Sequence, residues 1–118
     1  MRTILAAALL ALPCTLAAAQ EPGFATRTVG DLAGVCSGTV PGREKSAAEN
    51  FCDGYAQGLM SIVIDKDKNA ICLGARPPSR RATMNDFVTW ANASEQRKSM
   101  PAARGLLAFF QERFPCQR

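Results

Sequence analysis

Histidine is absent from the 118 residues of this chain, and tryptophan and tyrosine each occur only once. Without histidine, the usual serine or cysteine catalytic triad cannot be assembled. The chain also lacks a glycine-rich loop of the kind that holds phosphate groups. Acidic side chains such as Glu49 and Asp53 lie near one another in the sequence, but no pattern pairs them for acid–base catalysis. These absences predict a protein that is not an enzyme and that needs no cofactor.

A strong excess of charge of one sign is also lacking. Lysine and arginine total 14, aspartate and glutamate total 10, and the net charge is +4. The basic cluster of Arg76, Arg80 and Arg81 is interrupted by Pro77 and Pro78 and has no interleaved aromatic residue. A nucleic-acid-binding surface would need a denser basic stripe. We therefore expect no nucleic-acid partner.

The long apolar run of the sequence lies at its N-terminus. Arg2 precedes an apolar run at residues 4–12, and the alanines at residues 17–19 offer an A-x-A cleavage site. This pattern is typical of a secretory signal peptide. We predict a cleavable signal at residues 1–19, followed by one domain at residues 20–118.

A lipoprotein signal ending at Cys14 is the alternative interpretation of the same segment. Pro13 stands where a small residue should precede the lipidated cysteine, which disfavours it. No stretch after Ala19 is apolar for long enough to cross a bilayer. We expect an exported periplasmic protein with no membrane segment after signal cleavage.

Five cysteines are present, and the predicted cleavage removes one of them. The four that stay are Cys36, Cys52, Cys72 and Cys116. An even number of cysteines in a short exported chain predicts two disulfides. A zinc site is the alternative, but no Cys-x-x-Cys pair is present and export favours oxidation. We therefore expect no metal.

Helix start signals divide the chain after the predicted signal. Thr28, followed three residues later by an aspartate, predicts a short helix over residues 29–36. Ser46 with Glu49 forms a second capping box, which predicts a long helix to about Ile64. Apolar residues recur along this second helix at spacings of three and four, which indicates one buried face. That face comprises Ala48, Cys52, Tyr55, Ala56, Leu59, Met60 and Val63.

Gly54 and Gly58 lie four residues apart in the second helix. Each glycine costs a helix about 1 kcal/mol relative to alanine, so two of them need a structural reason. We expect that reason to be the close approach of another backbone within the domain.

Two further helices complete an all-α domain of four helices. The third should start near Thr83 and end near Ser94 or Gln96, with an inward stripe of Met84, Phe87, Val88 and Ala91. The fourth should start near Pro101, with an inward stripe of Ala103, Leu106, Leu107, Phe110 and Phe114. No alternating apolar run is long enough to predict a strand.

Four cysteines allow three pairings, and the order of helices favours one of them. A short link between the third and fourth helices should make them antiparallel, which returns Cys116 to the level of Cys72. Cys36, at the end of the first helix, would then pair with Cys52 in the second.

A resemblance to a known family rests on the order of these features. A cysteine ends the first helix, Cys52-Asp53-Gly54-Tyr55 with Gly58 lies in the second, Ile71-Cys72 follows, and Phe114-Pro115-Cys116 closes the last. In this order the features resemble the Tai (type VI amidase immunity) family, which includes the resistance-associated immunity proteins. The resemblance spans about Val29 to Cys116.

The resemblance implies a small disulfide-bonded helical protein of the periplasm, in a family whose members are often homodimeric. Such a protein binds a cognate peptidoglycan amidase injected by a type VI secretion system and blocks its active site by steric occlusion. A periplasmic helical binding or chaperone-like module with another partner is the alternative. An exported enzyme of unfamiliar type is the third interpretation.

An inhibitor that plugs a cleft usually presents a polar loop on a rigid scaffold, and two segments qualify, at residues 65–69 and 75–81. The second contains two prolines, which reduce the entropy lost on binding, and three arginines, which can bind carboxylates of a partner. The candidate partner-binding residues are Asp65, Asp67, Arg76, Arg80 and Arg81.

Overall fold

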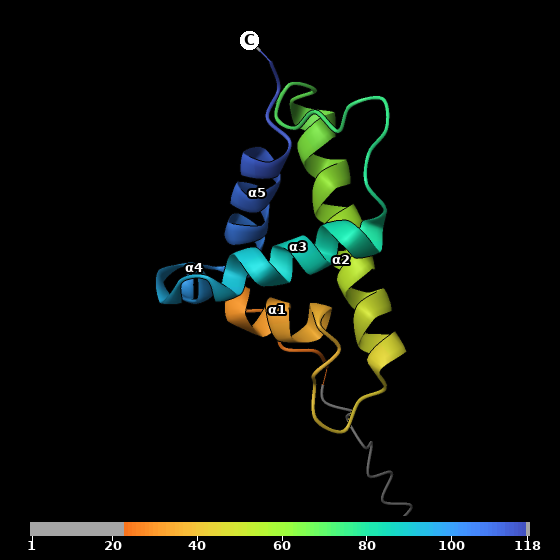
Figure 1. Cartoon of the computed structure of the whole chain (residues 1–118), viewed down its shortest axis with the longest axis vertical. Coiled ribbons are helices and arrows are strands. Elements are labelled where there is room, and N and C mark those ends of the chain that lie inside the picture. Colours follow the sequence, from red (N-terminus) through yellow and green to blue (C-terminus); the bar gives the residue numbers. More distant parts are fainter. Residues whose placement is uncertain (1–22, 118) are drawn as a thin grey trace, which may run out of the picture.

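The computed structural model describes residues 23–117, so the predicted signal peptide at residues 1–19 and Cys14 lie outside the described residues. Five helices form the described part of the chain (Figure 1): α1 (Val29–Cys36), α2 (Lys45–Lys66), α3 (Arg80–Asn92), α4 (Glu95–Ser99) and α5 (Ala102–Arg113). The predicted all-α class is confirmed. The short helix α4 is an addition, because the sequence predicted four helices.

Helix α1 is the centre of the domain, since it contacts each of the other four helices. Its bounds agree with the prediction. The Thr28 hydroxyl accepts a 3.1 Å hydrogen bond from the Asp31 amide, and the Asp31 carboxylate accepts one of 3.0 Å from the Thr28 amide. This capping box satisfies two amides that would otherwise lack a partner within the helix.

Backbone hydrogen bonds join the start of α1 to the start of α5. The Val29 amide donates to the Met100 carbonyl at 2.8 Å, and the Ala102 amide donates to the Arg27 carbonyl at 3.0 Å. Together they form an isolated antiparallel bridge between the chain segments that enter the two helices. The bridge sets the register in which α1 packs on α5.

Helix α2 begins at Lys45 with Glu44 at its N-cap position, and the Glu44 side chain makes no capping hydrogen bond. The Ala48 amide donates to the Glu44 carbonyl at 3.1 Å, so helical hydrogen bonding starts before Ser46 could act as a cap. The capping box predicted from Ser46 and Glu49 is therefore wrong, because Ser46 already lies in the first helical turn.

The glycines of α2 do not have the packing role predicted for them. Gly54 and Gly58 are exposed, and a Cβ atom added at either would meet nothing within 4 Å. The buried residues of α2 lie two positions away, on the opposite side of the helix. The close helix contact occurs instead at Gly105 of α5, where an added Cβ would overlap Val29 Cγ2 and approach Met100 Cβ to 3.5 Å.

Helix α3 starts one turn earlier than predicted. The Ser79 hydroxyl caps it by accepting a 3.1 Å hydrogen bond from the Ala82 amide. Thr83 is buried inside the first turn, and its hydroxyl donates to the Ser79 carbonyl at 3.0 Å. The helix ends at Asn92, and Ser94 caps α4 rather than continuing α3.

Helix α3 crosses α2 and α5 (Figure 1), whereas the sequence predicted that it would lie antiparallel beside the last helix. Phe87 of α3 is fully buried and meets Phe109 with ring centroids 5.5 Å apart. Ala103 was predicted to face inward but is exposed, and Ala102 and Phe109 occupy the buried face. The other large buried residues include Leu32, Val35, Met84, Leu106 and Phe110.

Two disulfides, Cys36–Cys52 and Cys72–Cys116, confirm the predicted pairing. The second forms for a different reason than predicted. Helix α5 runs beside the C-terminal half of α2 (Figure 1), and the Cys72 amide donates to the Phe114 carbonyl at 3.0 Å. Cys72 therefore meets Cys116 because α5 lies beside the end of α2, and not because α3 and α5 are antiparallel.

Candidate functional site

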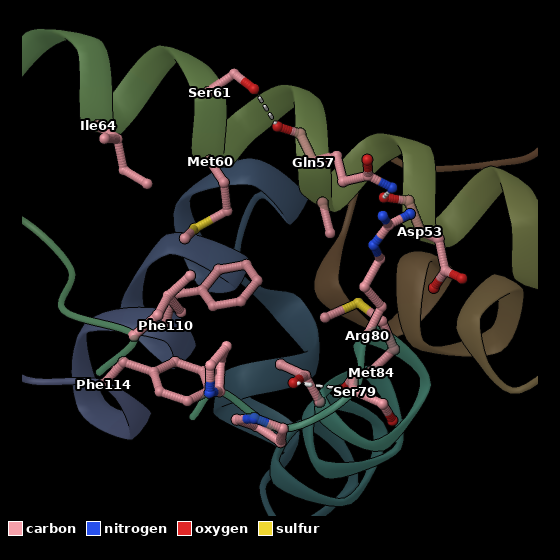
Figure 2. Close-up of a pocket in the computed structure, with 15 residues that line it drawn as sticks. Asp53, Gln57, Met60, Ser61, Ile64, Ser79, Arg80, Met84, Phe110 and Phe114 are labelled. Carbon is pink, nitrogen blue, oxygen red and sulfur yellow. Dashed lines mark hydrogen bonds between the residues drawn. The ribbon is translucent and has the colours of Figure 1, made fainter. Parts of the chain in front are cut away.

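An open groove lies between the C-terminal half of α2, the connection at residues 73–79, the first turn of α3 and the end of α5. Its volume is about 730 Å³. Ligand sites commonly have volumes of roughly 300–1,000 Å³. Figure 2 shows the side chains that line the groove, most of which are apolar. The groove is therefore large enough for several side chains of a partner.

The floor of the groove is part of the hydrophobic core. Met84, Phe110 and Phe114 are 2%, 4% and 7% exposed, and the last two rings stack with centroids 6.2 Å apart. Met60 and Ile64 of α2 point toward these rings (Figure 2). Because the core holds the floor in place, an apolar group that enters the groove meets a surface that is already formed.

One wall of the groove is the connection between α2 and α3. Leu73 is 40% exposed there, and the backbone of Gly74 has a φ of 75°, which residues other than glycine rarely adopt. Pro77 and Pro78 follow and fix their own φ angles. The Cys72–Cys116 disulfide anchors this wall to the end of α5. The wall is thus held at both ends, by the disulfide and by the start of α3.

Arg81 lies in the first turn of α3, not in the preceding loop. Its guanidinium forms hydrogen bonds within the domain. It donates hydrogen bonds of 3.2 Å to the Cys36 carbonyl, 3.0 Å to the Glu49 carbonyl and 2.7 Å to the Asp53 carboxylate. These bonds join α3 to α1 and α2. In the structure, Arg81 therefore stabilises the fold.

Arg80 lies beside Arg81 in sequence but is exposed and lines the groove. Figure 2 shows its side chain extending from α3 toward α2, with its guanidinium near Asp53 and Gln57. Within residues 23–117, the side chains of Arg80 and Arg76 have no hydrogen-bond or ion-pair partner. Arg76 is exposed in the wall segment. Arg80 thus places an available positive charge at one end of the apolar groove.

The two acidic candidates lie at the end of α2 and do not line the groove. Asp65 is in the last turn and is exposed. Asp67 is the C-cap residue, and its carboxylate accepts a 2.9 Å hydrogen bond from the Asn69 amide. The structure therefore brings only Arg80, of the five predicted residues, to the groove itself.

Sequence reasoning missed the apolar part of this site. Met60, Phe110 and Phe114 were predicted only as inward-facing core residues, and Leu73 was given no role. A usable signal was that Met60, Phe110 and Phe114 lie toward the C-terminal ends of the apolar stripes of their helices, where a core meets solvent. Their meeting across one groove depends on how α2 packs against α5.

The groove offers binding groups but no reactive constellation. Among residues 23–117, no three histidine, cysteine, aspartate or glutamate side chains lie together in a way that could hold a metal ion. No helix in this part of the chain is long and apolar enough to cross a membrane. An apolar surface beside an arginine can bind a partner through burial and a charged hydrogen bond.

The family model of the Rap1a immunity proteins matches residues 28–116, which include all five helices and both disulfides. No curated protein and no solved structure matches the chain. Rap1a immunity proteins are non-enzymatic inhibitors that bind a cognate effector protein, in agreement with the prediction that this protein is not an enzyme. The chain belongs to the family of Rap1a immunity proteins.

Proposed function

We propose that this protein is a periplasmic immunity protein that binds a peptidoglycan amidase delivered by a type VI secretion system and occludes its active site. The match of the Rap1a immunity protein family to residues 28–116 is the observation that carries this proposal. The resemblance to the Tai family supports an amidase as the target. Occlusion needs only binding, so a small rigid domain is sufficient for it.

Export to the periplasm is supported by the two disulfides. Cys36–Cys52 and Cys72–Cys116 join four cysteines in a small domain, and such pairs persist in oxidising compartments rather than in the cytosol. The signal-like sequence at residues 1–19 supplies the route of export. An amidase that attacks the cell wall acts in the same compartment.

We propose that the partner contacts the end of the domain that carries the groove. Arg76 and Arg80 are exposed there, and an arginine pairs well with a partner carboxylate because its fork of donors matches two oxygens. Arg81 contributes by holding α3 in position. Asp65 and Asp67 lie at the neighbouring end of α2, where they can contact basic residues at the rim of the interface.

The test is protection of cells from an amidase encoded beside the gene. The full chain, with its own N-terminal segment, is produced together with that amidase directed to the periplasm. We expect wild-type cells to survive, whereas cells with the amidase alone lyse. A chain that lacks residues 2–19 is the control, since it should stay in the cytoplasm and fail to protect.

Purified proteins extend the test. Hydrolysis of peptidoglycan by the amidase should fall to background when the immunity protein is present in equal amount. If the wild-type chain neither protects the cells nor inhibits the purified amidase, the proposed function is wrong. Co-purification of the chain with a different periplasmic protein would then support the alternative of a helical binding or chaperone-like module.

A further inference from the structure

The groove combines an apolar floor with a positive end, and this combination limits what can fill it. Met60, Phe110 and Phe114 form the apolar side (Figure 2), and Leu73 of the wall also lines the groove. Burial of apolar surface at such a site drives association, at about 25 cal/mol per Å². A strongly polar ligand, such as a sugar chain, would lose its water without replacing the hydrogen bonds.

The other end of the groove carries a positive charge, because the nearby carboxylate of Asp53 is paired with Arg81 and not with Arg80. Asp53 also lines the groove, but its carboxylate forms an ion pair with Arg81 at 2.7 Å, which offsets its charge. Arg80 lies within the groove, and within residues 23–117 it has no acidic partner. Arg76 adds a second exposed positive charge in the wall segment. A matching ligand therefore carries a negative group next to its apolar part.

We infer that the groove receives an apolar segment of the effector that carries a carboxylate, with the apolar side chains on Phe110 and Phe114 and the carboxylate on Arg80. This inference rests on the proposed function, because it takes the effector as the occupant. The inference also states which protein inserts a segment into the other. A segment of the effector enters the immunity protein, whereas the sequence predicted only a loop of this protein entering the effector.

The first experiment measures binding to the purified amidase by calorimetry, with one variant in the groove and one exposed apolar residue outside it as the control. Leu73→Asp should weaken affinity by at least about tenfold, since a charge is then buried against apolar side chains. Ile62→Asp is its control: Ile62 is 59% exposed and does not line the groove. We expect the control to change affinity by less than about twofold.

The role of Arg80 is tested by the same calorimetric measurement of affinity. Arg80→Ala should weaken affinity by about tenfold, because the carboxylate of the effector loses its partner. Arg104→Ala is the control, since Arg104 is also an exposed helix residue but lies outside the groove. All four variants should melt within a few degrees of the wild type, which separates loss of binding from loss of fold.

The second experiment identifies the segment that fills the groove. A photoreactive benzoyl-phenylalanine at position 73 should cross-link to an apolar stretch of the amidase next to an aspartate, a glutamate or the C-terminal carboxylate. The same group at position 62 should give no such product. Changing that side-chain carboxylate to lysine should weaken binding to wild type, and Arg80→Glu should restore part of the loss.

Three outcomes would overturn the inference. Equal affinities for Leu73→Asp and Ile62→Asp would remove the groove from the interface while leaving the proposed function intact. Cross-linking at position 73 to a second copy of this chain would assign the groove to self-association. Failure of the wild-type protein to bind the amidase would reject the proposed function, and the inference with it.

Discussion

Arg81 donates a hydrogen bond of 2.7 Å to the carboxylate of Asp53, which joins the first turn of α3 to the middle of α2. The same side chain bonds the Cys36 carbonyl, beside the Cys36–Cys52 disulfide. Neighbouring arginines thus have different roles. Arg81 faces the domain interior, and Arg80 lines the groove.

The two arginines should differ in their effect on stability. Arg81→Ala should lower the free energy of unfolding by roughly 2 kcal/mol, because it removes hydrogen bonds from a charged donor to half-buried acceptors. Arg80→Ala should change it by less than about 0.5 kcal/mol. Urea denaturation measures both. Arg81→Lys is a useful control, since it keeps the charge but cannot reach several acceptors at once. Equal losses for the two alanine variants would contradict this division.

Glycine substitutions should give opposite results in α2 and α5. Gly58→Ala should raise the free energy of unfolding by up to about 1 kcal/mol, because the site is exposed and alanine favours the helix. Gly105→Ala should lower it by roughly 1–3 kcal/mol, because the added methyl group overlaps Val29 and pushes α1 from α5. Thermal denaturation compares the two. A loss of stability in Gly58→Ala would show that α2 has a contact at this face.

The two disulfides should be reduced at different rates. Cys36 and Cys52 are each 1% exposed, whereas Cys72 is exposed. A thiolate reductant must reach a sulfur atom, so mild reductant should open Cys72–Cys116 first. Alkylation followed by peptide mapping at successive times measures the order. Earlier opening of Cys36–Cys52 would mean that the core around α1 opens more readily than the groove wall.

Replacing Cys72 and Cys116 together by serine should also lower stability. The pair closes a sequence separation of 44 residues. In the chain-entropy model, the lost cross-link corresponds to about 4 kcal/mol. Urea denaturation under oxidising conditions checks the value, with wild type measured with and without reductant as the control. An unchanged midpoint would show that the wall segment is held without the disulfide.

Low pH should lower the free energy of unfolding partly by weakening the N-terminal cap of α1. The backbone hydrogen bond from Thr28 lowers the pKa of the Asp31 carboxyl below its usual value. Because the folded-state pKa is lowered, the stabilisation is complete above the unfolded-state pKa, about 3.9, and is lost as pH falls through the folded-state pKa. Asp31→Asn should therefore lose stability at neutral pH and show a smaller further loss on acidification. Denaturation curves from pH 7 to about pH 2.5 test this. Parallel curves for the two proteins would contradict it.

Local signals determined the parts of the fold that depend on neighbouring residues. Thr28 and Asp31 cap α1 by bonds within four residues, so the sequence predicted both the cap and the bounds of that helix. The buried faces of α2 and α3 followed from helical periodicity. The number of cysteines predicted two disulfides, and both predicted pairs form, although the antiparallel packing from which Cys72–Cys116 was argued does not occur.

Tertiary contacts decided what the local pattern left open. Whether a glycine permits close packing depends on which side of its helix meets a neighbour, and the contact lies at Gly105 rather than at Gly58. Arg80 and Arg81 are alike in sequence, but successive residues of a helix point about 100° apart, so one faces the groove and the other the interior. The groove itself required α2, α5 and the disulfide-anchored wall to meet in space, because side chains distant in sequence form its floor.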